Sequence, residues 1–82
     1  QALYCAEAGL MHAVELLKTK NPPSTFEEEF SGGSYTVLII PLDKRTYLIR
    51  AEGEKEGQRR VVEMEILDNN FKVICWEEVG DV

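Results

Sequence analysis

Residues Gln1-Ala-Leu-Tyr-Cys-Ala-Glu-Ala-Gly-Leu10 open the chain and begin the helical pattern on which the fold depends. Apolar residues recur at alternating steps of three and four, which is the spacing of one helix face; they are Leu3, Ala6, Leu10, Ala13 and Leu17. The pattern predicts a helix over residues 2–19, and the prolines of Asn21-Pro-Pro-Ser24 end it because proline cannot continue the hydrogen-bond ladder. No Ser, Thr, Asp or Asn precedes the first turn as a cap, so we expect a longer helix whose first part lies upstream of Gln1.

The rest of the chain changes to a period of two, which is typical of strands. The alternation predicts four strands, over residues 34–40, 45–51, 58–67 and 70–76. Short loops between them favour an antiparallel meander, and its apolar face needs a cover that only the helix can supply. We therefore predict a single α+β domain over residues 1–82, with one N-terminal helix packed across a four-stranded antiparallel sheet. The predicted helix–sheet core consists of Leu3, Leu10, Leu17, Val62, Met64 and Ile66.

The segments between these elements are interpreted as loops. Residues 20–33 are expected to connect the helix to the first strand, with Phe26 and Phe30 covering one edge of the core and Glu27–Glu29 forming a solvated surface. Glu52–Gly57 is interpreted as a charged hairpin loop flanked by glycine. Asp68-Asn-Asn70 favours positive φ and is expected to close another hairpin.

Composition narrows the class of protein. The 82 residues are 44% hydrophobic and 29% charged, which is typical of one small globular domain. The net charge of −6 argues against binding to nucleic acid or to anionic lipid, because both rely on Lys and Arg. The sequence contains no run of 18 or more apolar residues.

No motif in the sequence indicates catalysis. His12 is the only imidazole, lies off the apolar line of the helix, and is interpreted as a surface residue. Gly32-Gly33 lacks the spacing of a phosphate-binding loop, and the alternating Glu63 and Glu65 indicate the solvent face of a strand. A single His without paired cysteines does not provide a metal-ligand pattern. We expect no catalytic residue, no cofactor and no metal.

The two cysteines, Cys5 and Cys75, lie near opposite ends of the sequence. Two interpretations remain open. The residues can form one disulfide that closes a long loop, or they can be two free thiols that pack as small apolar side chains.

The first helix resembles that of type IV pilus minor pilins and related pseudopilins. In that group a Tyr-x-Ala-Glu-Ala-Gly-Leu segment follows the membrane-spanning half of a long N-terminal helix, and six residues match it: Tyr4, Ala6, Glu7, Ala8, Gly9 and Leu10. Three later segments also resemble the strands of the family, in the same order, namely Gly33–Val37, Tyr47–Gly53 and Arg60–Ile66.

This resemblance implies an upstream apolar segment that anchors the protein in the bacterial inner membrane and later packs in a filament core. It also implies a head domain that faces the periplasm or the cell exterior, where oxidising conditions permit a Cys5–Cys75 disulfide. The implied partners are other pilin or pseudopilin subunits, which would contact the N-terminal helix. Small residues let helices approach closely, and the candidate partner contacts are Tyr4, Ala8, Gly9 and Met11.

Our hypothesis from the sequence is a non-catalytic assembly subunit of a type IV pilus or of a related secretion or DNA-uptake filament. The alternative is a soluble binding or inhibitory module, because a helix on a four-stranded meander also resembles cystatin-like domains. Such a module would use hairpin loops such as Glu52–Gly57 to contact its partner.

Overall fold

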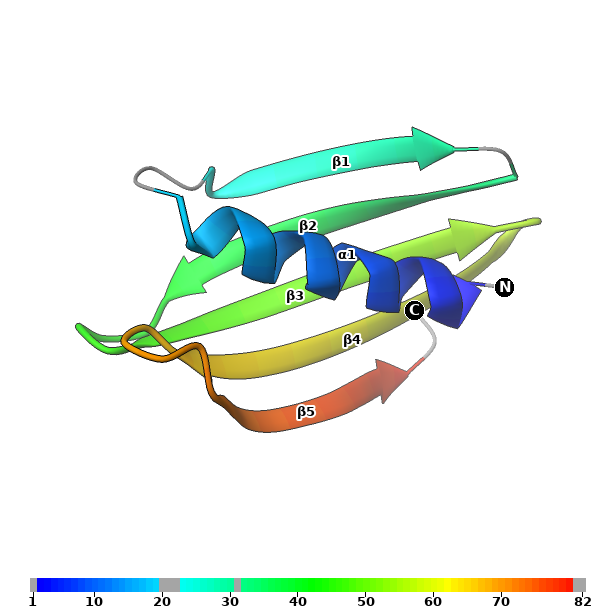
Figure 1. Cartoon of the computed structure of the whole chain (residues 1–82). Coiled ribbons are helices and arrows are strands. Elements are labelled where there is room, and N and C mark those ends of the chain that lie inside the picture. Colours follow the sequence, from blue (N-terminus) through cyan, green and yellow to red (C-terminus); the bar gives the residue numbers. More distant parts are fainter. Residues whose placement is uncertain (1, 20–22, 31, 81–82) are drawn as a thin grey trace.

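A computed structural model describes residues 2–19, 23–30 and 32–80 of the chain. It shows an α+β fold in which one helix lies on one face of a five-stranded antiparallel sheet (Figure 1). The elements are α1 (Ala2–Leu17), β1 (Thr25–Phe30), β2 (Gly33–Pro41), β3 (Thr46–Lys55), β4 (Gln58–Leu67) and β5 (Val73–Gly80). In the part of the chain that the structure describes, no helix is long and apolar enough to span a membrane.

The sheet is a meander, because its strands lie side by side in the order in which they occur in the sequence. The β3–β4 connection shows how tight the turns are. Glu56 and Gly57 both have positive φ, at 55° and 80°, and the flanking Lys55 and Gln58 pair with each other. Positive φ at both central residues is the requirement of the favoured two-residue hairpin turn. Most of the predicted Glu52–Gly57 loop is therefore strand, and only its last two residues form the turn.

The predicted loop over residues 20–33 is wrong in its second half, which contains β1. Thr25 to Phe30 pair with β2 in continuous antiparallel register, from Thr25 opposite Leu38 to Phe30 opposite Gly33. The Glu27–Glu29 run obscured this strand, because glutamate is depleted in strands and breaks the apolar alternation. Those three side chains are exposed, as expected of a solvated surface. Residues 20–22 and 31 lie outside the described part.

The bounds of β4 agree with the predicted ones, and those of the remaining predicted elements differ by a few residues. Helix α1 ends at Leu17, and Thr19 donates a hydrogen bond from its hydroxyl to the carbonyl oxygen of Leu16 at 2.6 Å. Strand β5 begins at Val73, where the prediction began it at residue 70, and it continues to Gly80. The positive φ expected within Asp68–Asn70 occurs instead at Phe71, at 56°.

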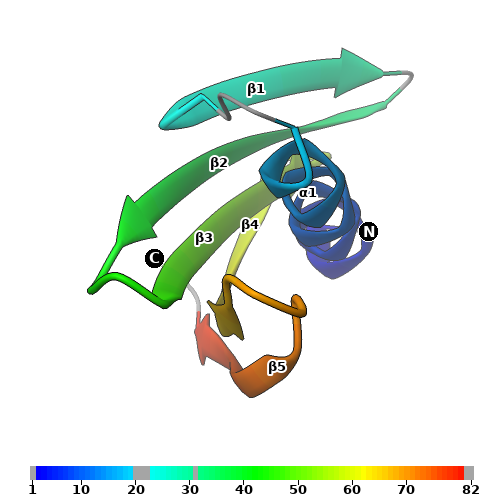
Figure 2. The same ribbon diagram turned by 60° about the vertical axis from the view of Figure 1, so that its left-hand side comes forward.

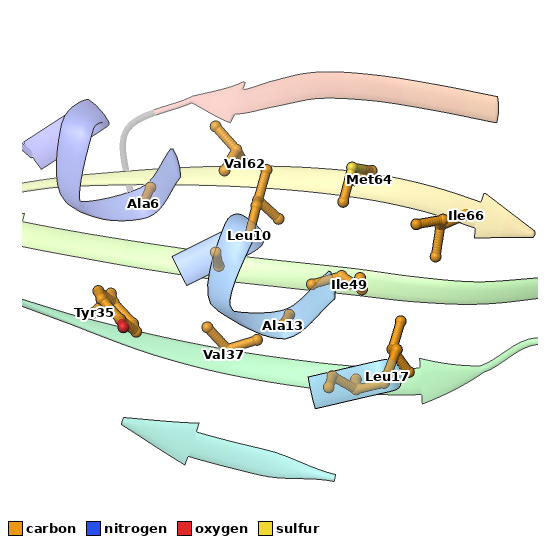
Figure 3. Packing of buried hydrophobic residues seen from close by; sticks show 12 residues of the cluster. Ala6, Leu10, Ala13, Leu17, Tyr35, Val37, Ile49, Val62, Met64 and Ile66 are labelled. Atoms are coloured by element: carbon orange, nitrogen blue, oxygen red, sulfur yellow. The ribbon is translucent and has the colours of Figure 1, made fainter. Parts of the chain in front are cut away.

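The core lies between α1 and the sheet. Figure 3 shows side chains from the helix pointing toward those of β2, β3 and β4, and the buried cluster includes Ala6, Leu10, Ala13, Leu17, Tyr35, Val37, Ile39, Ile49, Ala51, Val62, Met64 and Ile66. In Figure 2 the helix is viewed nearly along its axis and lies within the curve of the twisted sheet. Of the predicted core residues, the side chain of Leu3 lies outside the described part, and the other five belong to this cluster.

Candidate interaction surface

Helix α1 has two distinct faces. The face toward the sheet is buried, with Cys5, Ala6, Leu10, Ala13 and Leu17 each at most 6% exposed. The opposite face exposes large apolar side chains, because Tyr4 is 72% exposed, Met11 is 70% exposed, and Ala8 lies exposed between them. Exposed apolar residues that recur on one helix face form a continuous patch of the kind found at protein–protein contacts. Three of the four predicted partner contacts lie on this face.

The fourth, Gly9, faces the sheet. A Cβ atom at this position would lie 3.0 Å from Cγ2 of Val37 and 3.1 Å from Cδ1 of Tyr35. Gly9 is buried at the point where α1 crosses β2, and it lets the helix approach this strand closely. The prediction that Gly9 contacts a partner helix is therefore wrong, because the neighbour that needs its small size is the chain's own sheet.

An apolar groove of about 690 Å³ lies beside the exposed helix face, between α1 and β5. It exists because α1 contacts β2, β3 and β4, whereas the described residues show no such packing of α1 against β5. We call this the α1–β5 groove; its lining consists of Tyr4, Glu7, Ala8, Leu10, Met11, Val14, Met64, Ile66, Phe71, Val73 and Trp76. The volume falls within the range of about 300–1,000 Å³ that is typical of binding pockets.

The residues of β5 that line the groove were not predicted as site residues. Trp76 lies opposite Met64 in the ladder and Val73 lies opposite Ile66, so both share the helix side of the sheet with these core residues. Both are nevertheless about half exposed, at 47% and 48%. The sequence does contain apolar residues in the strand that pairs with the core strand β4. Their exposure could not be predicted, because it depends on how far the helix extends across the sheet.

The charged side chain that lines the α1–β5 groove lies toward the N-terminal end of α1. Glu7 is the one charged residue among the lining side chains that the structure describes, and it is half-buried. Lys18 lies near the other end of α1, with its ammonium 6.0 Å from the centroid of the Phe71 ring. Lys18 is also 3.6 Å from a carboxylate oxygen of Glu15 in the preceding turn, and both of these side chains are exposed.

His12, interpreted from the sequence as a surface residue, is half-buried and contacts the sheet. Its Nδ1 atom is 2.7 Å from the hydroxyl oxygen of Tyr35, and its ring meets the Phe26 ring edge-on at a centroid distance of 4.7 Å. The described residues show no group of three His, Cys, Asp or Glu side chains that could hold a metal ion. The arrangement around His12 joins three elements of the fold and lies apart from the α1–β5 groove.

The two cysteines lie on opposite sides of the sheet. Cys5 is buried on the inner face of α1, whereas Cys75 is exposed on β5 and lies opposite Glu65 in the ladder, away from the helix. Both thiols are free. Of the two interpretations left open by the sequence, the structure has free cysteines, although only Cys5 is buried.

Comparison of the chain with protein-family models, with curated proteins and with solved structures finds no match.

Proposed function

We propose that this domain is a non-catalytic assembly subunit, a minor pilin or pseudopilin of a type IV pilus or a related secretion or DNA-uptake filament. The observation that carries the proposal is the two-faced helix. One face of α1 covers the sheet, while Tyr4, Ala8 and Met11 leave the other face apolar and exposed, so that a second helix can pack against it. The sequence of the helix from Tyr4 to Leu10 resembles the motif of that family and supports the proposal.

The fold is consistent with such a role. A helix that lies over β2, β3 and β4 can present its outer face to neighbouring subunits without disturbing the core beneath. The resemblance adds an inner-membrane anchor in front of the domain, so that the head would face the periplasm or the cell exterior. An encoded protein without an apolar segment upstream of α1 would contradict the proposal.

The proposed docking face can be tested in the native bacterium with the full-length protein. Met11→Glu places a charge on the exposed helix face, and we expect loss of co-purification with the other filament subunits and fewer filaments in electron micrographs. The matched control is Ile40→Glu, because Ile40 is also a partly exposed aliphatic residue, at 41%, but lies on β2. Equal assembly by both variants, or equal loss of assembly, would contradict docking through α1. Circular dichroism of both variants checks that the fold is retained.

A further inference from the structure

The charge of Glu7 restricts what can occupy the α1–β5 groove. Glu7 lies on the same side of α1 as Tyr4 and Met11, which are three residues before it and four residues after it. The other lining residues are uncharged, and none of the ion pairs among the described residues involves Glu7. A body that filled the groove would remove water from this carboxylate. Since a buried carboxylate without a partner is strongly disfavoured, the occupant must supply a cation or strong hydrogen-bond donors.

The shape of the groove favours a helix over an added strand. The residues of α1 that line the groove run from Tyr4 to Val14, and this part of the helix is about 15 Å long at 1.5 Å per residue. Strand addition to the outer edge of β5 is disfavoured by two irregularities, because the register with β4 shifts next to Ile74 and next to Val79. Glu77 and Glu78 add charges to the same strand, as protected edges often do.

We propose that the α1–β5 groove binds an amphipathic helix of a partner subunit, and that a Lys or Arg of this helix pairs with Glu7. The apolar stripe of the partner helix packs against Met11, Trp76 and the floor formed by β4. Its cationic side chain reaches the Tyr4 end of the groove and forms a charge-assisted hydrogen bond with the carboxylate. This inference rests on the proposed assembly function for the identity of the partner, and it adds the chemistry by which a partner is selected.

The test uses the 82-residue chain and two synthetic helical peptides that lack tryptophan. Both peptides carry the same leucine stripe, and they differ only in having Lys or Gln at the positions that flank it. Trp76 is the single tryptophan of the chain and lines the groove, so its fluorescence reports occupancy directly. We expect the Lys peptide to bind about tenfold more tightly than the Gln peptide, which is the effect of one favourable charged pair.

Two variants of the chain separate a specific pair from general attraction to its net charge of −6. Glu7→Gln should abolish the preference for the Lys peptide. Glu15→Gln makes the same change in net charge at an exposed position of α1 outside the groove lining and should leave the preference intact. Urea unfolding of both variants confirms that they are folded.

The alternative outcomes are distinguishable. Equal binding of both peptides would overturn the pairing with Glu7 while leaving the apolar docking face in place. An equal loss of preference in the two variants would also overturn the pairing, because it would indicate non-specific attraction. If neither peptide changes the emission of Trp76, the groove is not a helix-binding site, and the filament assay with Met11→Glu decides separately whether the assembly function survives.

Discussion

The Nδ1 atom of His12 and the hydroxyl oxygen of Tyr35 are hydrogen-bonded to each other at 2.7 Å, which links the middle of α1 to β2. Phe26 from β1 packs edge-on against both rings, with centroid distances of 4.7 Å to His12 and 6.4 Å to Tyr35. The only His of the chain therefore connects α1 to both β1 and β2. Because α1 packs over the three central strands β2, β3 and β4, the edge of the sheet at β5 remains uncovered.

Removal of this hydrogen bond should destabilise the domain modestly. Tyr35→Phe keeps the ring and removes the hydroxyl, and we expect a loss of about 0.5–1.5 kcal/mol in the free energy of unfolding by urea. His12→Ala should cost more, because the ring contact with Phe26 is lost as well. In a double-mutant cycle the two substitutions should be non-additive. Strict additivity would contradict a direct interaction between the two side chains.

Gly9→Ala should destabilise the domain although alanine is the better helix former. Alanine gains about 1 kcal/mol over glycine in helix propensity. Its Cβ, however, would lie 3.0 Å from Val37 and 3.1 Å from the Tyr35 ring. Val37 is fully buried and Tyr35 is held by His12, so neither neighbour can move freely, and overpacking of this kind costs about 1–3 kcal/mol.

The control for this prediction is the reverse substitution at the exposed neighbour, Ala8→Gly. It should cost about 1 kcal/mol from helix propensity alone, because Ala8 faces away from the sheet. If Gly9→Ala instead stabilised the protein by the amount that Ala8→Gly destabilises it, the close approach of α1 to β2 would be refuted.

Stability should fall at alkaline pH because of Tyr35. Burial, together with the nearby charge of Glu28, raises the pKa of its hydroxyl above the usual value of about 10. Between the unfolded and the folded pKa the unfolded chain binds fewer protons, so the free energy of unfolding decreases as pH rises above about 10. Urea titrations at a series of pH values should show this decrease in the wild type relative to Tyr35→Phe. Parallel curves for the two proteins would count against a raised pKa, and the remaining tyrosines cancel in the comparison.

The two thiols should react at very different rates. We expect Cys75 to react rapidly with Ellman's reagent in the folded protein, because it is exposed, and Cys5 to react only after denaturation. Cys75→Ser should remove the fast phase and leave stability nearly unchanged. Formation of a Cys5–Cys75 disulfide in the folded protein under mild oxidation would contradict the placement of the two residues on opposite sides of the sheet.

The elements with strong periodicity were the easiest to predict. The apolar line of Ala6, Leu10, Ala13 and Leu17 located the helix, and the alternation of Val62, Met64 and Ile66 gave β4 its correct bounds, Gln58–Leu67. Both patterns are local, because each reflects a single element in contact with one apolar face. These patterns were sufficient to predict the α+β class and to identify the face of the helix that packs on the sheet.

Features that depend on non-local contacts were missed. Strand β1 has little strand propensity of its own and is defined by its pairing with β2. The last predicted strand ended at residue 76, but Glu77 and Glu78 continue β5, where Glu78 hydrogen-bonds with Arg60 of β4. The α1–β5 groove was also missed, because it depends on how far across the sheet the helix extends, which no segment of the sequence encodes alone.

The order of the strands has a consequence for how the chain folds. Each strand pairs with its neighbour in sequence, so the sheet can form through successive hairpins, each closing a short loop. The contacts between α1 and β4 span the longest stretches of chain among those of the core. Because low contact order speeds folding, we expect hairpin formation to be fast and docking of the helix to complete the native state. An intermediate with a formed sheet and an undocked helix would expose the whole apolar surface of β2, β3 and β4, and its lifetime would determine how readily the domain aggregates during folding.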